Sequence, residues 1–127
     1  MLFEAQSAKS IEDIDRGLRE AAVRHQFGIL GVINLREKMR DKGVEFDRDC
    51  LVYEVCNPHQ AKRVLDANGA ISTALPCRIS VYGKPGDHRI ATLLPTVLMQ
   101  GFNTPGIDDV ARQVEDAMIQ MVREAAG

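Results

Sequence analysis

The stretch Cys50-Leu51-Val52-Tyr53-Glu54-Val55-Cys56-Asn57-Pro58 sets a β-rich run directly before a helix opening. Its first six residues include the β-branched and aromatic side chains typical of a strand. Asn57 is suited to cap a helix and Pro58 to occupy its first position. Cys56 therefore stands where a strand becomes a helix. The free N–H groups and positive dipole end of that helix would favour a thiolate at Cys56 over a thiol.

The segments before this stretch predict a strand, a helix and a second strand. Residues 3–5 suit a short strand, and Ser10 is a helix cap with an acidic residue three places on. The apolar residues that follow recur at helical spacing until Gly28, and residues 28–33 read as a buried strand. Residues 35–48 are highly charged and predict one helical turn followed by a loop.

The segments after it predict two helices and a hairpin. The helix from Pro58 should close at Asn68-Gly69, and residues 78–82 and 89–93 alternate as two strands joined by a turn-rich segment. The last helix carries the longest apolar stripe in the chain. Its members are Val110, Val114, Ala117, Met118, Met121, Val122 and Ala125.

This order of elements predicts a single domain over residues 1–127, with helices packed on one mixed sheet. The fold class is α/β (α+β), a two-layer sandwich that is distantly ferredoxin-like. A parallel crossover through the helix from Pro58 would place Cys56 and Cys77 at opposite ends of the sheet. An antiparallel arrangement or a dimer contact would instead bring the two sulfurs together.

Composition excludes several classes of function. A chain of 127 residues buries about two thirds of its unfolded surface without a metal or disulfide. The net charge is −2, no Trp is present, and basic clusters are short, so a nucleic-acid partner is not expected. No apolar run is long enough to cross a bilayer, so no membrane partner is expected either. Three cysteines, an odd number, suit the reducing cytoplasm, and no cofactor is predicted.

Two motifs resemble a known family. Glu54-x-Cys56-Asn57-Pro58, followed by a short helix and Leu75-Pro76-Cys77-Arg78, is similar to the DUF302 family of small bacterial and archaeal α/β proteins. The likeness extends over nearly the whole chain, including Arg36-Glu37-Lys38 and residues 91–96. It implies a compact domain that pairs as a homodimer, and it supplies no substrate because the family is named for lacking an assigned function.

Strand alternation gives each cysteine a direction. Cys77 shares a face with Ile79, so we expect it to be a small core residue. Cys56 shares a face with Glu54. Cys56 is either a functional thiol or a residue packed where the chain turns. Core packing is the better expectation for Cys50.

The polar residues near Cys56 have alternative interpretations. Glu54 lies near enough to take a proton from Cys56, or it is a strand-face carboxylate that pairs with Lys or Arg or bonds the backbone. Arg78 is an anion ligand or, more simply, an ion-pair partner. Cys56 and His59 make half of a metal site whose other half is missing, so no metal is predicted beyond these weak candidates. His88, in a polar turn, is expected to be solvated. His25 is expected to be a hydrogen-bonded histidine in the core or at its boundary.

Two functions remain open. In the first, a homodimeric, non-catalytic module binds a small molecule, or assembles, through a pocket near the Cys56 turn. Its ligand-binding candidates are Glu54, Cys56, Asn57, Pro58, Cys77 and Arg78. In the second, Cys56 carries or exchanges a sulfur, redox or metal-bound group, with Glu54 assisting. The first is preferred, because a reactive thiol alone does not make an enzyme.

Overall fold

The computed structural model describes residues 1–127 as one sheet and its helices. The elements are β1 (Leu2–Ser7), α1 (Ile11–Arg24), β2 (Gly28–Asn34), α2 (Leu35–Asp41), β3 (Asp49–Cys56), α3 (Pro58–Ala67), the 3₁₀ helix η1 (Gly69–Ala74), β4 (Cys77–Lys84), β5 (Asp87–Leu93), α4 (Pro95–Gln100) and α5 (Asp108–Ala126). The five strands are ordered β1-β5-β4-β3-β2. None of the helices is long and apolar enough to cross a membrane.

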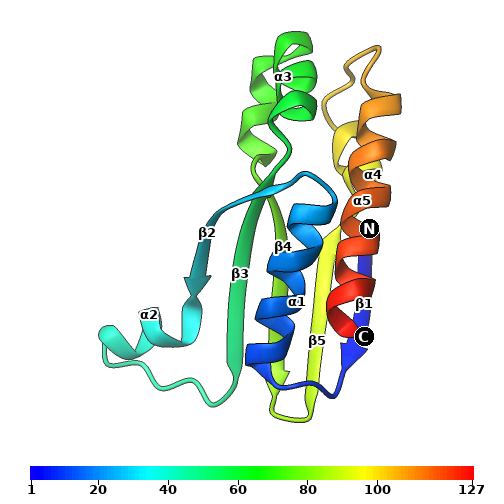
Figure 1. Ribbon diagram of the computed structural model, residues 1–127. Coiled ribbons are helices and arrows are strands. Elements are labelled where there is room, and N and C mark those ends of the chain that lie inside the picture. The colour runs from blue at the N-terminus through cyan, green and yellow to red at the C-terminus, as the bar shows by residue number, and fades with distance from the viewer.

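Two layers make up the molecule, as expected. Helices α1 and α5 run side by side over one face of the sheet, while α3 stands above the end of β3 and β4 (Figure 1). Every strand pair is antiparallel, so the parallel crossover considered for the helix from Pro58 is wrong. Helix α3 and η1 instead return the chain to the same end of the sheet, with Val55 paired to Cys77. Cys56 and Cys77 therefore lie at one end.

Helix caps confirm the local sequence signals. The Ser10 side chain accepts a hydrogen bond from the Asp13 N–H, and Asn57 Oδ1 accepts one from the Gln60 N–H at 3.1 Å. Pro58 occupies the first turn of α3, where its missing N–H costs nothing. The expected turn near residues 36–40 is a full seven-residue helix, because Asn34 caps it through the Glu37 N–H.

The turn between β4 and β5 needs glycine at two positions. Gly83 has φ +122° and Gly86 has φ +85°, both in the region that L side chains rarely adopt. A Cβ at Gly83 would lie only 2.5 Å from the Asp87 carbonyl oxygen. The predicted hairpin is thus confirmed, with Lys84 paired to Asp87 at its tip.

Buried side chains form two hydrophobic clusters. The main core lies between the sheet and the helices α1 and α5, and includes Tyr53, Val55, Ile79 and Met118. A small core lies beyond the end of the sheet, where α3, η1 and α4 meet the first half of α5. Its buried members are Val64, Ile71, Met99, Ile107, Val110 and Ala111. Helix α5 contributes to both cores.

The apolar stripe of α5 is mostly buried inside the molecule. Val110, Met118, Met121, Val122 and Ala125 are all fully buried. The stripe of α5 is therefore used in the two cores and does not itself offer an apolar surface to a partner. Two exposed leucines, Leu2 and Leu93, lie instead on the second face of the sheet.

No helix covers this second face, which we call the open face. Its strands carry alternating side chains that point away from the main core, such as Glu4, Tyr82 and Arg78. Leu2 and Leu93 are paired across β1 and β5 and are 54% and 45% exposed. The open face thus combines exposed leucines with charged groups.

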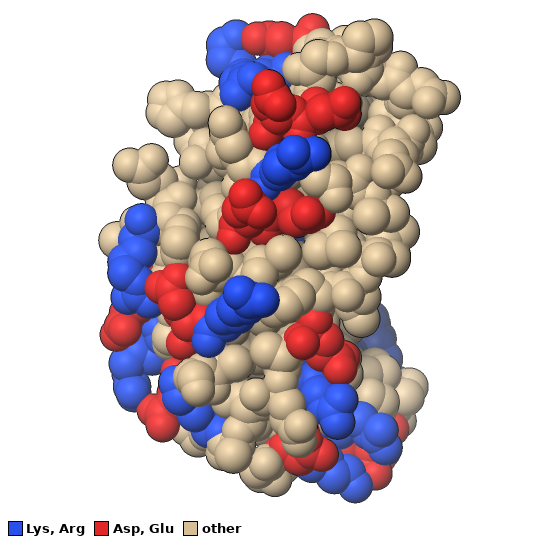
Figure 2. All heavy atoms as spheres, turned by 90° about the vertical axis from the view of Figure 1, so that its right-hand side faces the viewer, with Lys and Arg blue, Asp and Glu red and all other residues tan.

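Charges alternate in sign over the side of the molecule that carries α5 and β1. Figure 2 shows acidic and basic groups interleaved there, and neither sign forms a continuous patch. Several neighbours pair directly, as Glu4 does with Arg89 and Tyr82. Charges of both signs are therefore mixed over this side of the molecule.

An ion cluster fastens the end of α1 to the end of α5. Glu124 lies 2.7 Å from Arg24 Nε and 2.5 Å from His25 Nε2, so His25 does stand at the core boundary. The hydrogen bond with His25, and then that with Arg24, holds the pKa of Glu124 below its ordinary value of 4.5, against the effect of burial.

The Glu124 cluster predicts a loss of stability in acid. A depressed pKa contributes stability that is present above the unfolded pKa and is lost as pH falls through the folded pKa. We expect the free energy of unfolding to decline below pH 4.5. Glu124→Gln should lower stability at pH 7 by about 1 kcal/mol or less, since the pair is partly solvated. The same change should flatten the decline below pH 4.5, as measured by urea unfolding across pH. An unchanged pH profile in the variant would contradict this role.

Candidate functional site

A narrow apolar cavity lies at the seam between the main core and the small core. Its volume is about 50 Å³. Val55 and Phe27 reach it from the main core, and Val64 and Met99 from the small core. The complete wall is Phe27, Val55, Cys56, Asn57, Gln60, Ala61, Val64, Leu75, Pro76, Cys77, Pro95, Met99, Ala111 and Val114. None of these side chains carries a full charge at neutral pH.

The antiparallel return of the chain brings the predicted cysteine motifs together here. Cys56 ends β3, Cys77 begins β4, and the capped first turn of α3 closes the cavity between them. Four of the predicted ligand-binding residues are therefore near one another, and three of them line the cavity: Cys56, Asn57 and Cys77. Pro58 stands one position beyond the wall.

The environment of the thiols opposes ionisation. Burial raises the pKa of the Cys56 thiol above its ordinary value. Burial also raises the pKa of Cys77, to about 11, with the neighbouring Cys56 adding to the rise. Desolvation at the strand end thus opposes the thiolate that a helix dipole would favour. No disulfide links the three cysteines.

Glu54 and Arg78 lie apart from the cavity. They face each other across β3 and β4 on the open face, where the Glu54 carboxylate lies over Gly31. Neither makes an ion pair with the other or with any third group, so the expected strand-face pair does not form. Glu54 does not line the cavity and is not placed there as a base for Cys56.

The remaining cysteine and the nearby histidine have other positions. Cys50 is on the open face and half-buried, so the expectation of core packing is wrong. His59 is exposed on α3 and does not line the cavity. No group of three or more His, Cys, Asp or Glu side chains is placed to hold a metal ion.

Sequence reasoning missed most of the cavity wall. Phe27, Met99 and Ala111 come from three segments far from Cys56 in the chain. Gln60 was missed as well, although it is only four residues from Cys56. No local signal distinguishes a wall residue from any other helical residue, because the wall exists only after α3, α4 and α5 pack together.

A second, larger cleft of about 590 Å³ lies between α1 and the lower ends of β2 and β3. Its lining is mostly polar, but most of its charged side chains already pair within the fold. Asp15 accepts a hydrogen bond from the buried Tyr53 hydroxyl at 2.6 Å and pairs with Arg19. Burial alone would raise the pKa of Asp15, but these two contacts bring it below its ordinary value. The cleft is therefore a less favourable candidate for a ligand than the cavity.

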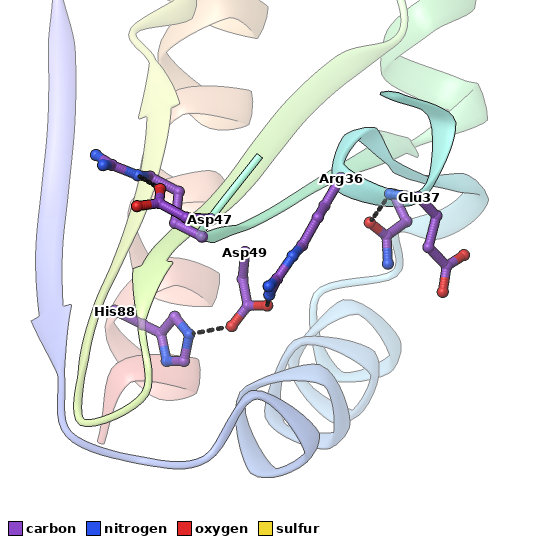
Figure 3. Close-up of polar contacts among 7 residues, drawn as sticks. Arg36, Glu37, Asp47, Asp49 and His88 are labelled. Carbon is purple, nitrogen blue, oxygen red and sulfur yellow. Dashed lines mark hydrogen bonds and ion pairs between the residues drawn. The ribbon is translucent and has the colours of Figure 1, made fainter. Parts of the chain in front are cut away.

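At the end of this cleft, Asp49 joins three segments. His88 Nε2 lies 2.8 Å from one Asp49 oxygen, and Arg36 Nη1 of α2 lies 3.3 Å from the other (Figure 3). The His88 side chain is only 1% exposed, so the expectation that it is solvated is wrong. The hairpin position of His88 directs its ring to the core side of the sheet, alongside Ile90. We interpret this cluster as a structural tie between α2, β3 and β5.

The fold is a small α/β sandwich. Its antiparallel strands have the order β1-β5-β4-β3-β2, two helices cover one face, and a narrow apolar cavity lies at one end of the sheet. The model of the family described as "Domain of unknown function DUF302" matches residues 3–125. The chain therefore belongs to the DUF302 family.

A solved structure of the same family is similar over its whole length. It is the crystal structure of an uncharacterized conserved DUF302 protein from Bacillus stearothermophilus, with a TM-score of 0.91 and 27% identity. The alignment covers 98% of this chain and 97% of that one. No curated protein matches the chain.

The raised thiol pKa values predict slow alkylation of the native protein. At pH 7–8 we expect iodoacetamide to modify Cys56 and Cys77 more slowly than an unfolded cysteine, with Cys77 the slowest. Peptide mass spectrometry of samples quenched over time measures each rate, and the urea-unfolded protein is the control. A Cys56 rate that titrates well below about pH 8.5 would contradict this prediction and show an activated thiolate.

Proposed function

We propose that this protein is a non-catalytic binding module that holds a small, mostly apolar ligand in the cavity between its two cores. The observation that carries the proposal is an apolar cavity beside the Cys56 turn, where two helices and two strand ends meet. Concave, mostly apolar sites with few polar groups are the usual form of small-molecule sites. The wall offers no general base, metal group or activated nucleophile to support a reaction.

The size of the cavity limits what it accepts. A single water needs roughly 10–15 Å³, and a dry cavity of about 150 Å³ takes benzene. About 50 Å³ suits a group of roughly four or five non-hydrogen atoms. The ligand is therefore either very small or inserts one short apolar end.

Small-ring probes test the proposal. Furan and pyrrole are five-membered rings of nearly equal size, and we expect them to shift backbone amide signals of α3 and the β3 end in ¹⁵N NMR titrations. Ala61 lines the cavity, so Ala61→Leu should fill it and weaken binding at least tenfold. Ala67→Leu, at the exposed end of the same helix, is the matched control and should leave binding unchanged. Absence of any localised shift with either ring would refute the proposal.

Thiol chemistry is the second candidate function, favoured by the two thiols on one wall. Cys56 and Cys77 both line the cavity, and a carried sulfur or soft metal group would find two sulfurs there. Free thiols also fit a reducing compartment such as the cytoplasm. The raised pKa values rank this candidate below ligand binding.

We further propose that the module is a homodimer that pairs through the open face of its sheet. Leu2 and Leu93 form an exposed apolar pair there. Exposed apolar patches commonly mark protein–protein interfaces. Glu54 and Arg78 are unpaired charges of opposite sign on the same face. In a two-fold dimer the same patch meets itself, so Arg78 of each copy has an acidic partner available in the other.

A charge placed in this apolar pair should separate the copies. In a two-fold dimer, Leu93→Arg places two positive charges near each other, one from each copy. We therefore expect the dissociation constant of the dimer to increase at least tenfold. Leu30→Arg is the control, because Leu30 is 65% exposed on the edge strand β2, away from the open face pair. Sedimentation velocity at micromolar concentration measures both. A wild-type protein that is only monomeric would overturn the dimer, and a Leu93→Arg protein that stays dimeric would overturn its location.

A further inference from the structure

Arg78 is a cation without a counter-charge on the open face of the sheet. Its guanidinium makes no ion pair and no hydrogen bond within the chain. Glu54 is its partner in the strand register, yet the two side chains do not pair. Arg78 is also exposed, so its N–H donors are available to a ligand in solution. Of the two roles that the sequence allows for Arg78, the ion pair within the chain does not form, and the anion ligand is left.

Two hollows of the surface meet at Arg78. One, of about 280 Å³, lies on the open face, and the other, of about 80 Å³, lies toward α4. Arg78, Thr92 and Leu93 line both hollows, which together we call the open-face groove. Glu54 lines neither of them, so Arg78 leans toward β5 and the groove and away from its partner in the register.

The lining of the groove combines a single charge with many apolar side chains. Arg78 is the only residue of either hollow that is charged at neutral pH. The apolar members include Leu2, Leu75, Leu93, Pro95, Leu98 and Met99. A guanidinium matches a carboxylate, because it can donate two parallel hydrogen bonds to the two oxygens. The lining therefore fits a molecule with a carboxylate at one end and an apolar chain at the other.

We propose that the open-face groove binds small amphipathic carboxylates, with the carboxylate paired to Arg78 and the apolar chain lying along the leucines. The inference goes beyond the cavity function, because Arg78 does not line the cavity. Arg78, Leu2 and Leu93 also belong to the surface through which we propose that two copies pair. A bound carboxylate therefore competes with the second copy for this face.

Hexanoate and 1-hexanol give the first test, because they share an alkyl chain and only hexanoate is charged. We expect both to shift the amide signals of residues 78–82 and 91–93 in ¹⁵N NMR titrations at pH 7. Hexanoate should bind about fivefold more tightly, and high salt should remove most of this preference. Equal affinities at low salt would overturn the pairing with Arg78. Absence of a localised shift with hexanoate would overturn the groove as a site.

Two variants test where the ligand lies. Arg78→Gln removes the charge, so its affinity for hexanoate should fall to that for 1-hexanol. Arg112→Gln, at an exposed position of α5, is the matched control and should change neither affinity. Ser80 lines the groove beside Arg78, so Ser80→Leu should partly fill it and weaken the binding of both molecules. Hexanoate affinity that is unchanged in Arg78→Gln would overturn the inference.

Sedimentation velocity separates this inference from the proposed dimer. If the wild type is a dimer, hexanoate should raise its dissociation constant more than 1-hexanol does, because only hexanoate occupies Arg78. A dissociation constant that hexanoate leaves unchanged would overturn the competition for a shared face. A wild type that is only monomeric would overturn the dimer, and the hexanoate titrations would then decide the groove alone.

Discussion

The packing of α5 against both cores is the constraint on which the rest of the structure depends. This 19-residue helix buries Met118, Met121 and Val122 in the main core, and Val110 and Ala111 in the small core. Val114 lies between them and packs against both clusters. Burying that many apolar side chains supplies a large share of the stabilising free energy of a small domain. The same helix fixes the distance between the two cores, and so the width of the seam.

The cavity follows from how the chain returns across this seam. A strand that ends at Cys56 must turn back to begin β4 at Cys77, because the two strands are antiparallel neighbours. Helix α3 and η1 fill the intervening length and stand above the sheet as a small separate layer (Figure 1). That layer packs on α5 through Val64 and Ile71. A narrow apolar cavity remains where it meets the main core.

Local sequence signals predicted most of the helices and strands. The direction of the strands and the orientation of some side chains depended instead on pairing between distant segments. Ser10, Asn57 and Pro58 mark helix starts because capping is a matter of a few neighbouring residues. No local signal gave the direction of β4 relative to β3, because a connecting helix of ten residues permits either a parallel or an antiparallel arrangement of the two strands. His88 shows the same limit. The turn-rich sequence around His88 predicted an exposed side chain. In the sheet, however, His88 is paired with Ser7 and Gly83, and its ring points inward to Asp49.

The candidate site was predictable in part for the same reason. Strand alternation correctly separated the side chains of Cys77 and Ile79 from the face of Glu54, and the two cysteine motifs do meet. Burial, which raises the thiol pKa values, depends on Phe27, Met99 and Val114, and these are remote in sequence. The helix dipole could be inferred from residues 56–58, whereas the desolvation that opposes a thiolate could not.

The central claim is that an accessible apolar cavity lies between the two cores, and xenon tests it most directly. Xenon is a single apolar atom that enters dry cavities and needs no hydrogen bond. In crystals pressurised with xenon, the account predicts one strong site in contact with Val55, Val64 and Met99. Ordered water filling that volume, or xenon bound only elsewhere, would contradict it.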